Sequence, residues 1–216
     1  MTISGVIFDL DGVLIDSAEA HRASWRQLGR EAGLAVTDAQ FAATFGRQNR
    51  DIIPILLGHA VDDATLRRLS DRKEELYREL ARGHLKIYPG ALELIADCAR
   101  AGLKLAIGSS THPENIDLAL EELGVRGQFA AIISSREVQR GKPDPQVFLL
   151  AAERLALEPS RCAVIEDAPD GIAAARAAGC ATIGVTSHHP RAALAAADLI
   201  VDSLRELSAA RISSLR

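Results

Sequence analysis

The feature of this sequence that most limits its possible folds is a repeated alternation of short apolar segments with longer segments of helical periodicity. Because the apolar residues run on without alternating, each strand should be covered on both faces, as in a parallel sheet packed between helices. We therefore expect an α/β fold, a doubly wound parallel sheet. The expected strands are residues 5–9, 103–108, 130–134, 162–166 and 181–185.

Helix start and stop residues flank the periodic segments. Pro89 and Gly90 precede one helical segment, Pro113 and Pro145 open two more, and Gly179 ends a fourth. Proline fits the first turn of a helix, and glycine fits the position just past its end.

A long helical insertion interrupts this alternation. Residues 16–85 show helical periodicity without a clear strand. We therefore expect two domains, an α/β domain made of residues 1–15 and 86–216 and a small helical domain made of residues 16–85. Residues 12–14 and 85–90 would be the hinges.

Composition and charge exclude several function classes. The 25 Lys and Arg against 29 Asp and Glu give a net charge of -4, which attracts neither nucleic acid nor anionic lipid over long range. Nothing resembles a signal peptide or a transmembrane helix. We expect a cytoplasmic monomer that binds neither nucleic acid nor membrane. The widely spaced Cys98, Cys162 and Cys180 should be buried thiols.

The first apolar segment ends in DLDG, residues 9–12. Side chains alternate in an extended chain, so Asp9 and Asp11 point the same way. Two close carboxylates need a cation or a division of labour between a nucleophile or metal ligand and a general acid and base. A simple strand-to-turn Asp-Gly remains open. A calcium loop does not fit, because Val13 and Ala20 occupy ligand positions.

Hydroxyl side chains follow the second apolar segment. Ser109, Ser110 and Thr111 precede the helix that opens at Pro113. A hydroxyl beside free N–H groups at a helix N-terminus can bind a phosphoryl oxygen. The alternative is that Thr111 or a neighbour caps the helix.

Lys142 stands just before Pro143 and close to Pro145. Prolines fix the backbone, which suits a lysine that reaches inward as a point charge on an anion. A solvated lysine in a proline-rich turn is the alternative.

A second acidic pair, Glu166 and Asp167, ends the fourth apolar segment. Oxygen ligands without nearby His or Cys suit Mg²⁺. Capping of the next helix by Asp167 or Asp170 is the alternative. The carboxyl ends of parallel strands share one edge, where ligands bind, so all four signals converge there.

These segments resemble, in order and spacing, the four motifs of the haloacid dehalogenase superfamily of phosphohydrolases. They are DLDGVLIDS, the strand end at Ser109, GKPDPQVF and VIEDAPDGIAAARAAG. The resemblance spans the whole chain. It is strongest to β-phosphoglucomutase-like phosphatases and mutases, through DLDGVLIDSAEAHRASW and the Tyr88-Pro89-Gly90 hinge. It implies a Rossmann-like core and identifies the helical insertion as a mobile cap.

The resemblance also implies roles for the acidic residues. Asp9 attacks phosphorus and forms an aspartyl-phosphate, while Asp11 protonates the leaving oxygen and later activates water. Mg²⁺ is held by Asp9, the backbone carbonyl of Asp11, and Glu166 or Asp167. Ser109 binds a phosphoryl oxygen and Lys142 neutralises charge. The dehalogenases of the superfamily lack an acid at the position of Asp11, so Asp11 argues against dehalogenation. Asp170 is expected only to cap a helix.

Substrate choice is expected to lie in the cap, which excludes water when closed. His21 and Trp25 share one helical face, although core packing is the stronger interpretation for Trp25. For Lys73 the alternative is a solvated helix face. His188 and His189 are expected in a surface loop, and metal ligation is the weaker alternative because no other ligand accompanies them. The candidate substrate-binding residues are His21, Trp25, Arg47, Asn49, Arg50, Lys73 and Ser110.

The sequence therefore predicts a Mg²⁺-dependent phosphatase of a small phosphorylated metabolite, a sugar phosphate. A phosphomutase like β-phosphoglucomutase is the alternative. A phospho-receiver module is a third possibility, and the cap speaks against it because a receiver needs no lid over its site. Mutases of this kind carry an arginine three residues after a cap-loop glycine. Here Gly46 is followed at that place by Asn49, with Arg47 and Arg50 displaced, so hydrolysis is favoured.

Overall fold

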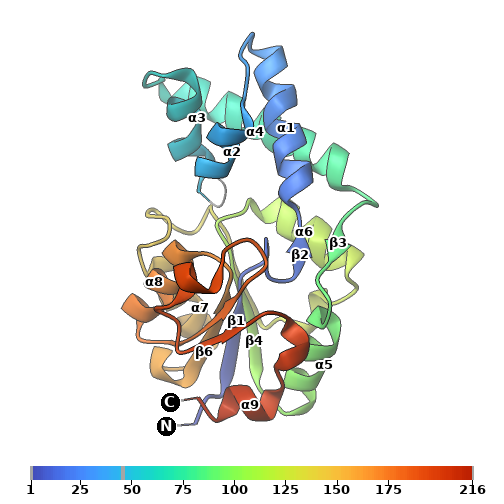
Figure 1. Cartoon of the computed structure of the whole chain (residues 1–216), viewed down its shortest axis with the longest axis vertical. Coiled ribbons are helices and arrows are strands. Elements are labelled where there is room, and N and C mark those ends of the chain that lie inside the picture. Colours follow the sequence, from blue (N-terminus) through green and yellow to red (C-terminus); the bar gives the residue numbers. More distant parts are fainter. Residues whose placement is uncertain (1, 45–46, 216) are drawn as a thin grey trace. The chain divides into compact units, whose positions relative to one another are not determined.

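The chain forms two compact units in the computed structural model, which describes residues 2–44 and 47–215 (Figure 1). One unit comprises the chain up to Asp16 and from Ile87 onward, and the other is Ser17–Lys86. The chain crosses between them at β2 (Ile15–Asp16) and β3 (Lys86–Ile87), which pair as a two-stranded sheet.

A six-stranded parallel sheet forms the centre of the α/β unit, which confirms the predicted fold class. All five predicted strands are present, and the edge strand β8 was not predicted. The order across the sheet is β5 (Ala131–Ile133), β4 (Lys104–Gly108), β1 (Gly5–Phe8), β6 (Cys162–Glu166), β7 (Ala181–Val185) and β8 (Leu199–Val201).

Helices cover both faces of this sheet (Figure 1). Right-handed crossovers place α5 (Ala91–Arg100) and α6 (Pro113–Glu122) on one face, and α7 (Gln146–Arg154) and α8 (Pro169–Ala178) on the other. The short α9 (Ala209–Ser213) packs against α5. Both faces of the strands are buried, which explains why their apolar residues do not alternate with polar ones.

The strand register brings the functional segments to one level. Phe8 pairs with Ile107 of β4 and with Ile165 of β6. Asp9, which follows Phe8, therefore emerges beside the end of β4 and beside Glu166. The connections from β1 and to β6 run over opposite faces of the sheet, so this edge is a switch point of the topology, where α/β proteins bind ligands.

The described residues of the second unit form four helices with their own apolar core. Trp25 packs there with Leu28, Phe41 and Ile53, as expected for its core position. The helices are α1 (Ala18–Glu31), α2 (Asp38–Thr44), α3 (Asn49–Leu57) and α4 (Asp63–Ala81).

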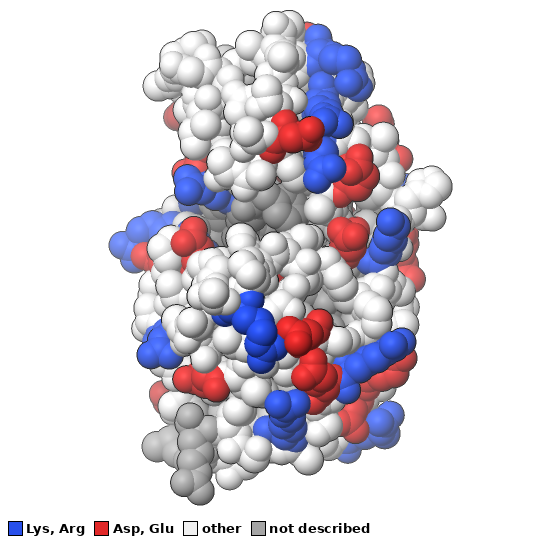
Figure 2. Space-filling view, viewed as in Figure 1, with Lys and Arg blue, Asp and Glu red and all other residues white. Residues whose placement is uncertain are grey.

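Acidic and basic side chains lie next to one another on the face of each unit that Figure 2 shows. Ion pairs join Arg72 to Glu31 in the helical unit at 2.9 Å, and Arg191 to Asp202 in the α/β unit at 2.7 Å. Within the described ranges, no helix has the length and apolar character needed to cross a membrane.

Candidate active site

Lys142 links the first and the fourth predicted motifs. Its Nζ atom lies 2.7 Å from Oδ1 of Asp9 and 2.6 Å from Oε1 of Glu166, and it donates to the carbonyl oxygen of Gly108 at 3.2 Å. The Lys142 side chain is only 8% exposed, so the alternative of a solvated lysine is wrong.

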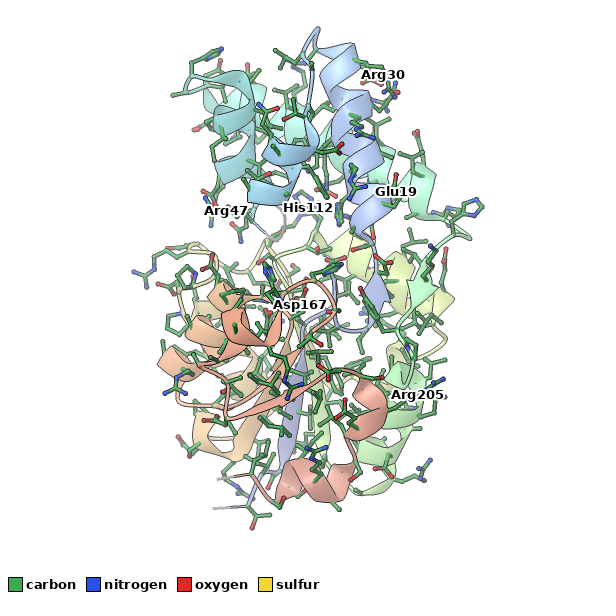
Figure 3. The ribbon with its side chains drawn as sticks, viewed as in Figure 1. Glu19, Arg30, Arg47, His112, Asp167 and Arg205 are labelled. Atoms are coloured by element: carbon green, nitrogen blue, oxygen red, sulfur yellow. The ribbon has the colours of Figure 1, made fainter. Side chains whose placement is uncertain are left out.

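Three carboxylates meet beside this lysine. Asp9, Glu166 and Asp167 are all buried and offer oxygen atoms within 4.8 Å of one another. Figure 3 shows Asp167 near the strand ends of the α/β unit. An all-oxygen set of this kind suits a hard cation such as Mg²⁺.

The charges of this cluster oppose one another. Burial raises the pKa of Asp9, and Glu166 and Asp167 raise it further, while Lys142 opposes the rise. Burial lowers the pKa of Lys142, but the Asp9 and Glu166 carboxylates outweigh it and hold that pKa above its usual value. Three buried carboxylates share one lysine, so the site has an excess of negative charge that a divalent cation would neutralise.

The Glu166 side chain is fixed by the backbone that follows it. Its Oε2 atom accepts hydrogen bonds from the N–H groups of Asp167 and Ala168, both at 2.9 Å. A Cβ atom at Gly171 would lie 1.9 Å from the Glu166 carboxyl carbon, so glycine is required for this close approach.

The two acidic residues proposed as helix caps do not cap α8. That helix begins at Pro169, after Ala168, so Asp170 lies inside its first turn rather than in the capping position. A carboxylate there is still favoured by the helix dipole. Asp167 precedes the capping position, and its carboxylate bonds to a histidine described below.

Thr111 bonds to the second aspartate of the first motif. Its hydroxyl donates to Oδ2 of Asp11, and its backbone N–H donates to Oγ of Ser109 at 3.1 Å. α6 begins at Pro113, and its neighbour His112, labelled in Figure 3, occupies the capping position without a capping hydrogen bond from its side chain, so capping by Thr111 is wrong. Thr111 instead orients Asp11. Ser109 is buried, and Ser110 beside it is half-buried.

His188 contacts this site from the loop that follows β7. Its Nδ1 atom lies 2.8 Å from Oδ2 of Asp167, and its Nε2 atom lies 3.3 Å from the Tyr88 hydroxyl. The bond to Asp167 raises the pKa of His188, although burial opposes the rise. Burial, with Asp16 and Asp167 nearby, raises the pKa of Tyr88 to about 12. His188 therefore lies in a loop, as predicted, but its side chain is only 21% exposed and belongs to the site through its bond to Asp167.

One signal could have found His188. The residue stands three positions after β7, and the parallel pairing of β7 with β6 brings the ends of both strands to the same edge. The sequence does not state that β7 is the neighbour of β6, so it could not place His188 beside Asp167.

Polar side chains form a buried cluster within the helical unit. Lys73 Nζ lies 2.7 Å from Nδ1 of His21 and 2.9 Å from Oε1 of Glu74, and it lies over the Trp25 ring at 5.3 Å. The same Glu74 oxygen accepts from the Asn49 amide at 2.7 Å. Lys73 is 2% exposed, so the solvated-face interpretation is wrong. Glu74 was not predicted, because DRKEEL is typical of an exposed helix.

The two cap-loop arginines are not in this cluster. Arg47 and Arg50 are exposed, and Figure 3 shows Arg47 at the surface of the helical unit. Gly46, from which the arginine position was counted, lies outside the described residues.

A family of known proteins matches most of the chain. Residues 3–179 match the haloacid dehalogenase-like hydrolases. The chain is 34% identical over 206 residues to the chloroplastic 5-amino-6-(5-phospho-D-ribitylamino)uracil phosphatase of Arabidopsis thaliana. That match covers 94% of this chain and 55% of the plant protein.

Two further similarities extend along nearly the whole length of both chains. The validoxylamine A 7'-phosphate phosphatase of Streptomyces hygroscopicus subsp. limoneus is 32% identical, over 93% of this chain and 94% of its own. The crystal structure of β-phosphoglucomutase from Clostridium difficile superposes on this structure with a TM-score of 0.85 and 28% sequence identity. The match covers 95% of this chain and 93% of the mutase chain.

Proposed function

Because the chain belongs to the haloacid dehalogenase-like hydrolases, and is a phosphatase, we propose that it hydrolyses a small sugar phosphate with the help of Mg²⁺. The observation that carries the proposal is the position of Lys142 between Asp9 and Glu166, with the Asp167 carboxylate beside them. This arrangement suits an anionic substrate whose phosphoryl group is transferred to a carboxylate.

Asp9 is the nucleophile in this proposal. An oxygen of its carboxylate forms a bond to phosphorus while the bond from phosphorus to the ester oxygen breaks, which leaves an aspartyl-phosphate. Lys142, held on Oδ1, offsets the charge of Asp9 and fixes its orientation. Water then attacks the phosphorus atom, the bond from phosphorus to the Asp9 oxygen breaks, and inorganic phosphate leaves while the Asp9 carboxylate is regenerated.

Asp11 is the general acid and base. It gives its proton to the leaving oxygen in the first step and takes a proton from water in the second. The hydroxyl of Thr111 donates to Oδ2 of Asp11 and so orients the carboxyl group that makes these transfers. The buried Ser109 hydroxyl would hold a phosphoryl oxygen, with Ser110 beside it.

The carboxylates of Asp9, Glu166 and Asp167 and the backbone carbonyl of Asp11 would hold Mg²⁺, which supplies positive charge to the phosphoryl group when bound. A phosphate dianion and three carboxylates carry about -5, and Mg²⁺ with Lys142 reduces this to about -2. Backbone N–H groups at the strand ends would compensate the rest.

The helical unit favours hydrolysis over isomerisation. A phosphomutase must hold a second phosphate, and the resemblance puts that task at the position of Asn49. Here the Asn49 amide donates a hydrogen bond to the Glu74 carboxylate, and the same carboxylate offsets the charge of Lys73. A buried carboxylate repels a second phosphate. A monophosphate whose leaving group carries hydroxyls is therefore the better substrate, with His21 and Lys73 among its contacts.

A panel of sugar and polyol monophosphates, assayed for released phosphate with Mg²⁺ and with EDTA, tests this function. We expect release from at least one sugar monophosphate, and loss of that release with EDTA and in Asp9→Asn. Release that continues unchanged in EDTA would contradict the metal requirement, and full activity in Asp9→Asn would contradict the nucleophile.

A further inference from the structure

The loop after β7 reaches two of the functional motifs at once. Ser187 donates its hydroxyl to the carbonyl oxygen of Gly12, in the turn that follows Asp11. The next residue, His188, bonds to the Asp167 carboxylate at 2.8 Å. One dipeptide thus connects the turn of the first motif to a carboxylate of the fourth.

The His188 ring is held at both nitrogens. Nδ1 faces Oδ2 of Asp167, and Nε2 faces the Tyr88 hydroxyl at 3.3 Å. A neutral ring that donates from Nδ1 to the carboxylate accepts the Tyr88 proton at Nε2, so a single tautomer satisfies both bonds. The ring therefore has one preferred orientation, with its donor directed at Asp167.

Gly12 lies close against this pair. Gly12 has φ +86°, and a Cβ atom there would lie 2.2 Å from Oδ2 of Asp167 and 2.7 Å from Nδ1 of His188. The backbone of the first motif therefore lies directly against the bonded Asp167–His188 pair. Glycine is needed both for the positive φ and for this close approach.

We propose that His188 is a positioning residue that holds Asp167 by Oδ2 and presents the other carboxylate oxygen to the divalent cation. The inference rests on the proposed function, because it requires that a cation binds among Asp9, Glu166 and Asp167. A carboxylate free to rotate must be ordered when the cation binds, whereas one already held loses less freedom. Partners of this type change metal affinity by about 10- to 100-fold in other metal sites.

Calorimetric titration with Mg²⁺ alone, without substrate, tests the role of His188. We expect His188→Ala to bind Mg²⁺ about tenfold or more weakly than the wild type. His188→Asn, whose amide nitrogen can take the place of Nδ1, should bind more tightly than His188→Gln, whose amide reaches the place of Nε2. His189→Ala is the matched control, because the same loop carries it, and its affinity should equal that of the wild type.

The outcomes separate the two proposals. If the wild type does not bind Mg²⁺, the metal requirement of the proposed function fails. If the wild type binds Mg²⁺ and all His188 variants bind equally well, the role of His188 is overturned while the proposed function stands. Should His188→Ala fail to fold, the comparison of His188→Asn with His188→Gln still decides, since equal affinities overturn the inference.

Discussion

The Nζ atom of Lys142 lies 2.7 Å from Oδ1 of Asp9, and both side chains are less than a tenth exposed. The same atom reaches Glu166 at 2.6 Å. Lys142 therefore separates two buried carboxylates that would otherwise repel each other without a cation.

Replacing Lys142 should destabilise the metal-free protein. Breaking a buried ion pair by removing one partner typically costs roughly 3 to 5 kcal/mol of unfolding free energy, so Lys142→Met should lose about that much at pH 8 in EDTA. Urea unfolding of the wild type and the variant measures the difference.

This loss should depend on pH in a defined direction. Burial already raises the pKa of Asp9 in the folded protein, and removing Lys142 takes away the group that opposes the rise. A carboxyl with a raised folded pKa favours the folded state at low pH, and this stability is lost as pH rises through that pKa. The deficit of Lys142→Met should be smaller at pH 5 than at pH 8. An equal deficit at both pH values would contradict the account of the cluster.

Asp62 should stabilise the helical unit through its carboxylate. It caps α4 and accepts from the N–H of Thr65 at 2.8 Å, and this hydrogen bond holds the pKa of Asp62 below its usual value. A carboxyl with a lowered folded pKa contributes stability above the unfolded pKa, and the contribution is lost as pH falls through the folded pKa. Asp62→Ala should therefore melt at a lower temperature than the wild type at pH 7. The two melting curves should converge below about pH 4. A melting difference that persists undiminished well below that pH would contradict this prediction.

The three cysteines are buried, as predicted, and should be chemically inert in the folded protein. Burial raises the pKa of Cys98 and of Cys180 to about 12 and that of Cys162 to about 11. Since the thiolate is the reactive form, iodoacetamide at pH 8 should label the native protein far more slowly than the protein in guanidinium. Mass spectrometry counts the labels. Rapid inactivation that substrate prevents would show a reactive cysteine in the site and contradict this reading.

Hydrolysis should exceed isomerisation. With β-glucose 1-phosphate and a glucose bisphosphate primer, phosphorus NMR should show inorganic phosphate forming and little glucose 6-phosphate. The reason is that Asn49, bonded to Glu74, lacks the charge-assisted fork with which arginine grips phosphate. If primed enzyme isomerises the substrate much faster than it releases phosphate, the mutase alternative is correct. Arg47→Ala and Arg50→Ala would then identify the arginine that holds the second phosphate.

Much of the fold follows from patterns local in the sequence. Continuous apolar segments predict buried parallel strands, and Pro113 and Gly179 lie at observed helix boundaries. The strand β8 was not predicted, because it has only three residues and follows an alanine-rich stretch that favours helix. Its strand conformation comes from pairing with β7.

The polar contacts show where local patterns stop being sufficient. Lys73 stands among charged residues on α4 and becomes buried only because His21, 52 positions away, and Glu74 satisfy it. His188 contacts Asp167 across two neighbouring strands, and Thr111 contacts Asp11 across 100 positions. Such pairs depend on which helices and strands become neighbours in the fold. The spacing of residues in the sequence does not give this information. The catalytic roles given to Asp9 and Asp11 stay predictions.

The most direct test of the central claim, an aspartyl-phosphate on Asp9, uses Asp11→Asn with p-nitrophenyl phosphate. Nitrophenolate leaves without needing a proton, so the first step should proceed, while the second lacks its general base and should stall. We expect acid-quenched protein to carry one phosphoryl group on the peptide that contains Asp9, and hydroxylamine to remove it. The double variant with Asp9→Asn should carry none. An unmodified Asp9 peptide, together with wild-type turnover by Asp9→Asn, would contradict the account.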